Sequence, residues 1–406
     1  MSTAPLFNLN DFIAEHVTER RTSLLAPDLR DHHATLAERI DGKTVLVIGG
    51  AGTIGSSFIR ALLRFRPAAL CVVDTNENGL AELSRDLRSG VDYHVPEDYV
   101  TYPMDFGSRV FEKMFRTRGG FQIVANFAAH KHVRSEKDRY SIEAMLETNV
   151  FKAKRLLDLL VDFPPERYFS VSTDKAANPV NVMGASKKLM EEVILAYGDV
   201  FPVTTARFAN VAFSNGSLLA SYAERLARRQ PLVAPTDIRR YFVSPDESGQ
   251  ICLAAAILGR TGEVLFPKLR EDQMRTFATI ARAWLRAQGF TPTEMTDENL
   301  ARTQVQSELE EGRYPLFLFG SKTSGEKAYE EFYTDAEQTD FERFAHLGVV
   351  TDAYHRDRSE LEELIADLRA VLDREEGGKE DIVAKLRQLL QNFAHLETGR
   401  SLDQGI

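Results

Sequence analysis

The feature that most constrains the fold is a glycine-rich turn between a strand-like and a helix-like segment. The stretch TVLVIGGAGTIGSSFIRALL, residues 44–63, runs from apolar and β-branched residues through this turn into an amphipathic pattern. Glycines let a backbone turn tightly and approach a pyrophosphate, and the following helix offers free N–H groups and the positive end of its dipole. Thr53 and Ile54 open that helix. The spacing is GxGxxG, with a GxxGxxG variant one residue earlier, and the glycines are Gly49, Gly50, Gly52 and Gly55.

An acidic residue at the end of the next strand supports a dinucleotide site. Asp74 closes the run ALCVVD, 19 positions after Gly55 (74 − 55). A carboxylate there accepts hydrogen bonds from ribose hydroxyls and repels a 2′-phosphate. Because Thr75 and Asn76 supply no cation for such a phosphate, NAD is the expected cofactor and NADP is less favoured. A glycine turn that binds no dinucleotide is the alternative.

Two later strand ends are further candidate cofactor contacts. Asp105, in YPMDF, follows the third strand-like run, where it can contact adenine; a solvated turn aspartate is the alternative. Ala128 and Ala129, in NFAAHKHV, end the fourth run, and their small side chains let a cofactor lie against the backbone.

Buried-type strands alternate with amphipathic helix patterns from residue 42 onward. The strand-like runs are TVLVIG, ALCVVD, QIVANFAA, RYFSVST and PVTTARFANV. Parallel strands need crossover connections and are buried on both faces. The sequence therefore predicts an α/β fold with a Rossmann-type doubly wound parallel sheet, a smaller mixed substrate-binding lobe and C-terminal helices.

Changes of pattern predict four regions. Residues 1–41 form a helical N-terminal extension, 42–215 the NAD-binding domain with the catalytic residues, 216–335 the substrate-binding lobe and 336–406 a C-terminal helical region. In the last region, SELEELIADLRAVLDREE and EDIVAKLRQLLQNF carry apolar residues at three- and four-residue intervals. Such faces suggest interface helices and a homo-oligomer.

The composition is that of a soluble globular protein. The 406 residues are 43% hydrophobic and 27% charged, and the net charge of -10 disfavours nonspecific binding to nucleic acid or anionic lipid. Cys71 and Cys252 lie in apolar runs, as expected of buried, reduced thiols. No apolar run reaches the ~18 residues of a membrane span, and no secretory signal is evident, so a cytoplasmic protein is expected. His130 and His132 have no acidic or cysteine partner nearby, so no metal site is predicted.

Several motifs together resemble a known family. GGAGTIG, NFAAHKHV, STDKAANPVNVMGASKK and ARFANVAFSNGS are similar to those of the extended short-chain dehydrogenase/reductases. More narrowly, the chain resembles the inverting UDP-N-acetylglucosamine 4,6-dehydratases of polysaccharide and flagellin glycan biosynthesis. The resemblance covers roughly residues 42–270, and STDKAANP is its most specific part.

The resemblance implies roles for residues at and after the end of the strand-like run RYFSVST. Thr173, Asp174 and Lys175 are expected to be catalytic, and Lys187 to hold the nicotinamide ribose. Many relatives carry a tyrosine four residues before that lysine, where this chain has Met183. The soluble branch of the family has tyrosine and the membrane-anchored capsule branch has methionine. This chain has the methionine without membrane helices, so it matches neither branch as a whole.

A 4,6-dehydration needs a base for the sugar C4 hydroxyl, a base for the C5 proton and an acid for the C6 oxygen. The resemblance suggests Asp174 at C4 and Lys175 at C5 and C6, with Thr173 orienting a sugar oxygen. Retaining relatives have glutamate in place of Lys175, so inversion at C5 is expected. In the alternative interpretation, Asp174 merely caps a helix and Met183 marks a loss of activity.

The substrate side is expected to come from loops beyond the catalytic segment. Asn210 lies where the family holds the sugar diphosphate, and Arg239 and Arg240 precede two aromatic residues. A guanidinium grips a diphosphate bidentately and an aromatic ring stacks on uracil, so this is a candidate nucleotide clamp. The remaining residues expected to line the substrate are His130, Lys131 and Met183.

Two features leave substrate contacts open. Arg207 either binds the diphosphate or supports the sheet. SGEK, residues 324–327, resembles a late RxGEK element of the family but lacks its arginine.

The leading interpretation is an NAD-dependent dehydratase of a UDP-sugar. A nucleotide-sugar 4-epimerase on the same fold is one alternative, although it needs no C5 base and usually keeps the tyrosine. A catalytically silent protein that binds NAD or a nucleotide sugar is the other. The uridine and the N-acetylglucosamine rest on the resemblance alone.

Overall fold

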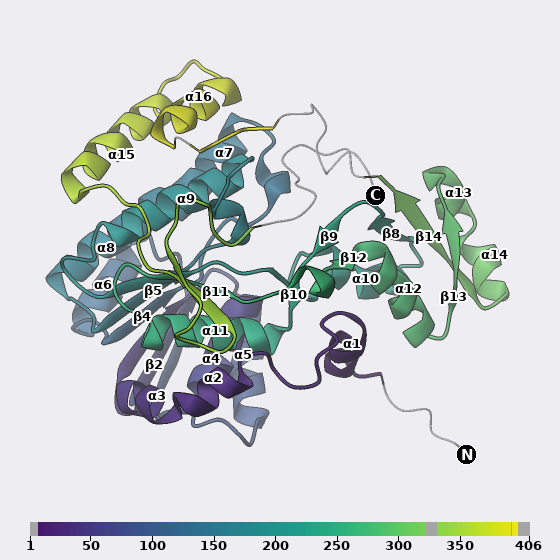
Figure 1. Ribbon diagram of the computed structural model, residues 1–406, viewed down its shortest axis with the longest axis horizontal. Coiled ribbons are helices and arrows are strands. Elements are labelled where there is room, and N and C mark those ends of the chain that lie inside the picture. The colour runs from purple at the N-terminus through teal and green to yellow at the C-terminus, as the bar shows by residue number, and fades with distance from the viewer. Residues whose placement is uncertain (1–6, 321–330, 391, 397–406) are drawn as a thin grey trace.

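The computed structural model describes residues 7–320, 331–390 and 392–396 (Figure 1). Its core is one nine-stranded sheet built from the apolar runs predicted as strands. In chain order the strands are β1 Thr44–Ile48, β2 Ala69–Asp74, β3 Asp98–Pro103, β4 Ile123–Asn126, β5 Arg167–Val171, β6 Val203–Ala206, β11 Val264–Pro267, β15 Thr339–Asp340 and β16 Leu347–Val350.

The strand order is β15-β16-β11-β6-β5-β4-β1-β2-β3. All pairs from β3 to β11 are parallel, whereas β16 runs antiparallel to β11 and to β15. The order reverses between β1 and β4, which is where ligands bind in open α/β sheets. The prediction of a Rossmann-type parallel sheet is confirmed.

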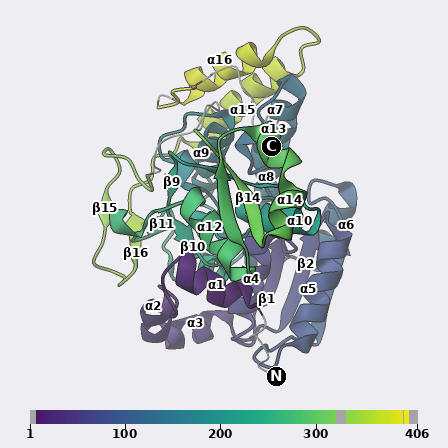
Figure 2. The same cartoon turned by 90° about the vertical axis from the view of Figure 1, so that its right-hand side faces the viewer.

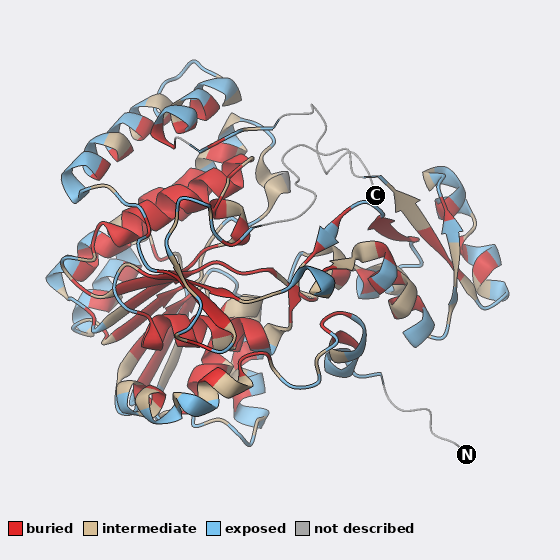
Figure 3. Cartoon of the chain, in the orientation of Figure 1, coloured by how far each residue is buried: buried red, intermediate tan, exposed pale blue. Residues whose placement is uncertain are grey.

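Helices cover both faces of this sheet (Figure 1). One face carries α4 Thr53–Leu62, α5 Glu77–Ser89 and α11 Pro245–Leu258, with α2 Ala26–Asp31 and α3 His33–Ile40 outside them. The other carries α6 Arg109–Thr117, α7 Arg139–Leu146, α8 Lys152–Asp162 and α9 Val182–Leu195, and a π-helical turn, η2 Glu147–Phe151, joins α7 to α8. Every residue of α9 is buried (Figure 3), because the sheet lies on one side of this helix and other helices lie on the rest.

A smaller lobe stands beside the sheet and faces the viewer in Figure 2. Its parallel sheet, β13-β14-β8, comprises β8 Leu232–Pro235, β13 Thr291–Met295 and β14 Arg313–Phe319. Its helices are α10 Leu218–Ala227, α12 Phe277–Ala287, α13 Glu298–Thr303 and α14 Val305–Glu310. Two short strand pairs connect it to the main sheet: β7 Asn210–Val211 with β10 Phe242–Val243, and β9 Arg239–Arg240 with β12 Arg275–Thr276.

The chain returns from the lobe to the main sheet more than once. Residues 245–267, within the range assigned to the lobe, form α11 and β11 of the sheet domain. Residues 339–350, within the range assigned to the C-terminal helices, add β15 and β16. The apolar runs ICLAAAIL and VLFP explain the first return, because both segments are buried within the sheet layer.

The N-terminal extension is helical and joins both bodies. Its first helix, α1 Leu9–His16, packs on the lobe, where the ring of Phe12 meets Trp284 edge to face at 5.2 Å. Arg20 then donates from Nε to Glu247 of α11 at 2.9 Å. The buried carboxylate of Asp28 accepts the backbone N–H groups of residues 345 and 346, at 2.6 and 2.9 Å.

The C-terminal helices, α15 Arg358–Leu372 and α16 Lys379–Leu389, pack over α7, α8 and α9 (Figure 1). Their apolar faces are buried within the chain, and the guanidinium of Arg369 lies 3.6 Å from the ring centroid of Phe151. The faces that suggested self-association are therefore occupied inside the monomer. A homo-oligomer remains a prediction, but the apolar faces of these two helices no longer support it.

Two compositional expectations can be compared with the structure. Cys71 and Cys252 are buried free thiols, as predicted, and burial raises the pKa of Cys71 to about 12. Across the part of the chain that the structure describes, no helix combines the length and apolarity that crossing a bilayer requires.

The contact of Asp28 predicts that the extension stabilises the sheet domain. Asp28→Ala should lower the free energy of unfolding by roughly 2–4 kcal/mol, since two N–H groups lose a buried charged acceptor. Asp31→Ala is the control, because Asp31 is exposed in the same helix and should stay within about 0.5 kcal/mol of wild type. Urea denaturation measures both; equal effects would contradict this role of Asp28.

Candidate active site

The segment STDKAANPVNVMGASKK connects the carboxyl end of β5 to α9. Thr173 caps the 3-10 turn η3, Asp174–Ala176, with its Oγ1 3.5 Å from the Lys175 N–H. Asn181 then caps α9 by accepting the Gly184 N–H at 2.7 Å. A Cβ at Gly184 would lie 2.5 Å from the Lys175 carbonyl oxygen. Glycine therefore lets the turn with the predicted catalytic residues sit directly against the first turn of α9.

Asp174 and Lys175 form an ion pair at this turn. The Oδ1 atom of Asp174 accepts from Lys175 Nζ at 3.0 Å, from the Lys175 N–H at 3.0 Å and from Thr173 Oγ1 at 2.8 Å. The Asp174 side chain is 4% exposed, whereas that of Lys175 is 18% exposed. Three of the predicted catalytic residues thus form one hydrogen-bonded cluster. The same bonds also cap η3, so the capping interpretation and the catalytic one are compatible.

Lys187 points from α9 toward the end of β5. Its Nζ donates to the Val171 carbonyl at 2.7 Å and lies 3.3 Å from Met190 Sδ. Burial lowers the pKa of Lys187 to about 8, while the charge of Glu191 acts in the opposite sense. Met183, one turn earlier, is buried, so its thioether packs where relatives with a tyrosine would carry a phenol.

A buried arginine ties this helix to the neighbouring strand. Arg207 donates to Glu191 at 2.9 and 2.7 Å and to Glu337 at 2.8 Å from each of two nitrogens. Burial raises the pKa of Glu191, but Arg207 outweighs that effect and leaves it at about 2. Ser172, which lies just before Thr173 and the η3 turn, donates to the same carboxylate at 2.5 Å. Of the two roles that the sequence left open for Arg207, the structure favours support of the sheet.

The glycine turn forms a tight cradle at the end of β1. Gly49 has a φ of +76°, and a Cβ at Gly55 would lie 2.3 Å from the Gly49 carbonyl oxygen. Asp74, at the end of β2, accepts the Ala51 N–H at 2.9 Å and so faces this turn. The cradle, the helix N-terminus and the carboxylate are the parts that a dinucleotide requires, so these residues fit that cofactor. The rest of the predicted set, Gly50, Gly52, Thr53 and Ile54, lies in the same turn and the start of α4.

Asn215 bridges the cradle and the loop after β4. Its N–H donates to Thr53 Oγ1 at 2.9 Å, and its carbonyl accepts from Lys131 Nζ at 2.9 Å. Sequence reasoning missed this residue. The sequence SNGS predicts a turn at Asn215, but it does not indicate that this residue contacts Thr53 and Lys131.

The other predicted cofactor contacts differ in what they can offer. Asp105 pairs with Lys152; burial would raise the pKa of Asp105, but this lysine lowers it overall. The backbone at Ala128 lies against the cradle, since a Cβ at Gly49 would fall 2.6 Å from the Ala128 nitrogen. Ala129 follows it and is half-buried. The end of β4 therefore lies beside the cradle, and contact of Ala128 and Ala129 with a cofactor stays a prediction.

The loop that begins at His130 is fixed by a residue that the sequence did not reveal. The buried Asn149 of η2 accepts the His130 N–H at 2.8 Å and donates to the His130 carbonyl at 3.0 Å. Its amide also donates to Ser186 at 2.9 Å, and Ser186 donates to the Met183 carbonyl at 2.7 Å. The His130 and Lys131 residues themselves are exposed, which leaves them accessible to a substrate.

The predicted diphosphate residues lie where the sheet meets the lobe. The Asn210 N–H donates to the Tyr241 carbonyl at 3.2 Å, which places Asn210 next to the arginine-containing strand. Arg240 is buried and donates to the Arg239 carbonyl at 3.0 Å, whereas Arg239 is exposed and pairs with Glu271 at 3.4 Å. The SGEK motif lies outside the described residues.

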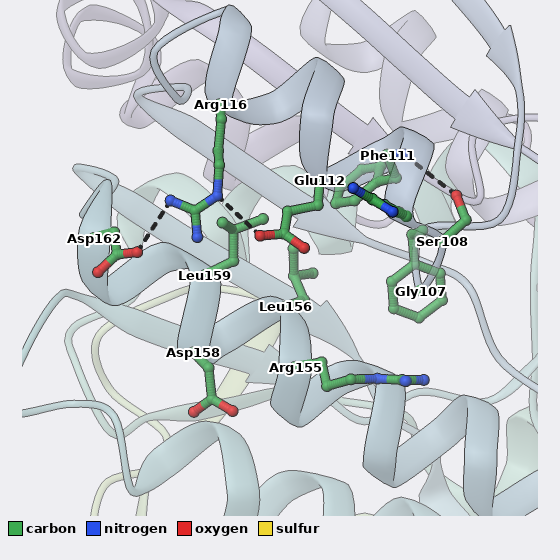
Figure 4. Close-up of a pocket in the computed structure, with 12 residues that line it drawn as sticks. Gly107, Ser108, Phe111, Glu112, Arg116, Arg155, Leu156, Asp158, Leu159 and Asp162 are labelled. Atoms are coloured by element: carbon green, nitrogen blue, oxygen red, sulfur yellow. Dashed lines mark hydrogen bonds and ion pairs between the residues drawn. The ribbon is translucent and has the colours of Figure 1, made fainter.

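A cavity of about 560 Å³ lies between α6 and α8 (Figure 4). Part of its charged lining is paired internally, with Arg116 donating to Glu112 at 2.9 Å and to Asp162 at 3.2 Å. None of its lining residues belongs to the predicted site. Within the described ranges, no group of three or more His, Cys, Asp or Glu side chains is placed to hold a metal ion.

Comparison with known proteins identifies the family. The model of a family described as polysaccharide biosynthesis protein matches residues 45–351, so the chain belongs to that family. It is 29% identical over 317 residues to an uncharacterized membrane protein of Methanocaldococcus jannaschii, covering 76% of this chain and 85% of that one. It is 27% identical to the probable polysaccharide biosynthesis protein EpsC of Bacillus subtilis, covering 83% of this chain but 54% of that protein.

Named enzymes are also similar at low identity. The inverting UDP-N-acetylglucosamine 4,6-dehydratase of Campylobacter jejuni is 26% identical over 248 residues, 59% of this chain and 70% of the enzyme. The UDP-glucose 4-epimerase of Rickettsia canadensis is 27% identical over 248 residues, with the same coverage. Relatives of this chain thus include both dehydratases and epimerases of nucleotide sugars.

Solved structures show the same fold. The structure of Pen from Bacillus thuringiensis matches with a TM-score of 0.62 at 19% identity, over 81% of this chain and 98% of that one. The dTDP-glucose 4,6-dehydratase DesIV of Streptomyces venezuelae, solved with NAD and TYD bound, gives a TM-score of 0.52 at 21% identity, over 72% and 87%.

The buried Lys187 predicts a pH-dependent stability. Its pKa is about 8 in the folded chain against 10.5 when solvated, so the folded state binds fewer protons between these values. Its burial therefore destabilises wild type by about 3 kcal/mol below pH 8, and that cost disappears as the pH rises to about 10.5. The stability of wild type relative to Lys187→Met, from urea titrations at each pH, should rise across this window. A constant difference would contradict the lowered pKa.

Proposed function

We propose that the protein is an NAD-dependent nucleotide-sugar 4,6-dehydratase that acts on UDP-N-acetylglucosamine with inversion at C5. The observation that carries this proposal is the hydrogen-bonded cluster of Thr173, Asp174 and Lys175 at the end of β5, next to the buried Lys187. Membership of the polysaccharide biosynthesis family and the similarity to a Campylobacter enzyme of that name support it.

The cofactor residues proposed from the sequence fit the geometry of the cradle. The glycine turn and the start of α4 would hold the pyrophosphate, Asp74 the adenosine ribose, and the backbone at Ala128 and Ala129 would lie beside the cofactor. Lys187 of α9, whose Nζ lies at the end of β5, would hold the nicotinamide ribose. When bound, NAD⁺ would accept a hydride from sugar C4 and later return it to C6. A carboxylate at Asp74 favours NAD over NADP.

We infer that Asp174 acts as the base at the C4 hydroxyl, in place of the absent phenol. It is buried, and its Oδ1 already accepts three hydrogen bonds, so its orientation is fixed before substrate arrives. Lys175 Nζ lies 3.0 Å from the same oxygen. To act as the base at C5, Lys175 would first release its own proton to solvent, and Asp174 would then take the C4 proton and stand protonated beside a neutral amine.

Lys175 would complete the elimination. It takes the C5 proton, made acidic by the C4 ketone, and gives a proton to the departing C6 hydroxyl, so that water leaves and a C5–C6 double bond forms. Return of the hydride to C6 and a new proton at C5 from solvent, balanced by release of the C4 proton from Asp174, would then give the 4-keto-6-deoxy sugar. Inversion requires that this new proton arrive on the face opposite to Lys175.

The nucleotide would be held where the lobe meets the sheet. Asn210 lies on β7, which pairs with β10, and the arginines at 239 and 240 form β9, which precedes β10 in the chain. His130, Lys131 and Met183 would line the sugar end. The exposed Arg239 is the more accessible of the two arginines, while the buried Arg240 fixes the strand. Of the two, Arg239 is therefore the better candidate for the diphosphate contact.

An epimerase is the second candidate function, because similar proteins include named UDP-glucose 4-epimerases. Mass spectrometry separates the two after incubation of the protein with UDP-N-acetylglucosamine and NAD⁺. A dehydratase yields a sugar nucleotide lighter by one water, whereas an epimerase yields an isomer of unchanged mass. If neither product forms across a panel of UDP- and dTDP-sugars, the silent alternative holds and the proposed function is wrong.

Lys175→Ala tests the assignment at C5. Turnover to the dehydrated product should fall at least 10³-fold, since the elimination loses its base and its acid together, while the Kd for NAD⁺ should change less than about twofold. Lys113→Ala, an exposed lysine on α6, is the control and should retain full activity. Product formation by mass spectrometry and NAD⁺ binding by calorimetry give both readouts. If Lys175→Ala kept more than a few per cent of activity, its role would be refuted.

A further inference from the structure

Glu136 joins three segments of the chain beside the candidate catalytic turn. It follows the short turn η1, Val133–Ser135, in the loop that also carries His130 and Lys131. One carboxylate oxygen, Oε2, accepts the Val182 N–H of the first turn of α9 at 2.7 Å. The other oxygen, Oε1, bonds His395 Nε2 and lies 3.2 Å from Lys379 Nζ. Neither partner of Oε1 is near Glu136 in the sequence.

The residues after α16 run along the link between η3 and α9. The Ala394 N–H donates to the Pro179 carbonyl at 3.1 Å, and the Leu396 N–H donates to the Val180 carbonyl at 2.9 Å. The side chain of Asn392 adds a bond to the Ala177 carbonyl at 2.8 Å. The C-terminal segment, residues 392–396, therefore binds the backbone that separates Lys175 from Met183.

The contacts at Glu136 are shielded from water. The side chains of Glu136 and His395 are each 6% exposed, and that of Lys379 is 17% exposed. Burial would raise the pKa of Glu136, but the bonds from His395 and from the Val182 N–H, with the charge of Lys379, lower it overall. A buried carboxylate with these partners resists displacement, because moving it would leave charges unpaired.

We propose that Glu136 is a positioning residue through which the C-terminal segment sets the first turn of α9, and with it Met183 and Lys187, against the catalytic turn. The proposal rests on the proposed function for its catalytic consequence but not for its structural one. The bonds of Glu136 and of residues 392–396 reach the first turn of α9 and the link that precedes it. An effect on turnover would pass through these two elements, where a displacement of about 1 Å can cost ~10²-fold in rate.

Hydrogen–deuterium exchange tests the structural part without requiring any activity. In Glu136→Ala and in His395→Ala, peptides covering residues 176–190 should exchange at least tenfold faster than in wild type. Asp367→Asn is the control, because Asp367 forms an exposed ion pair with Lys385 between the same two C-terminal helices. Unchanged exchange at 176–190 in both variants would overturn the proposal, whether or not the protein proves to be a dehydratase.

Kinetics test the catalytic part on whichever sugar nucleotide the protein turns over. His395→Ala should lower kcat about tenfold when assayed well below its melting temperature, with KM near that of wild type, since it leaves the nucleotide contacts intact. Glu136→Gln keeps an acceptor for the Val182 N–H and should lie between wild type and Glu136→Ala. If kcat fell only in parallel with the melting temperature, Glu136 would be a stabilising residue alone and the positioning role would be wrong. If wild type showed no turnover while exchange behaved as expected, the proposed function would fail and the positioning contact would stand.

Discussion

The buried arginine Arg207 is the contact on which the geometry of the candidate site depends. It leaves the end of β6, and its two carboxylate partners come from α9 and from a segment 130 residues later in the chain. A fully buried guanidinium is tolerable only when its charge is paired and its donors are bonded, and here Glu191 and Glu337 do both. Glu191 also accepts from Ser172, so one charge network fixes the strand end that carries Asp174 and the helix that carries Lys187.

The methionine at position 183 changes what the neighbouring residues must do. A thioether accepts no proton, so in the proposed dehydration another residue would be the base at C4. Asp174 is the proposed base, and its turn packs against the first turn of α9. Three donors converge on one oxygen of this carboxylate, which fixes its position without a phenol. Lys187 keeps the place it has in the family pattern, but its Nζ now lies beside the Val171 carbonyl and a thioether, Met190, in an apolar setting.

Much of the sheet domain could be predicted because its signals are local. The glycine turn, Asp74 and the apolar strands report on neighbours within about 30 residues, and the fold agrees with them. Contacts between distant segments carry no such signal. Asn149 and Asn215 hold loops near the site, yet each is a single polar residue whose partners lie far away in sequence. The apolar faces of the C-terminal helices could also be predicted, but the surface that packs against them could not. A helix that packs on α8 and α9 has the same pattern of apolar residues as a helix that packs on a second chain.

The central claim is that Asp174 and Lys175 perform acid–base chemistry on a nucleotide sugar without a tyrosine. Proton NMR of UDP-N-acetylglucosamine, incubated with the protein and catalytic NAD⁺ in deuterated water, tests it most directly. The account predicts a new C6 methyl signal, a 4-keto or hydrated product, and deuterium at an inverted C5. A methyl product with the original C5 configuration, or with C5 still carrying its own proton, would contradict the role assigned to Lys175.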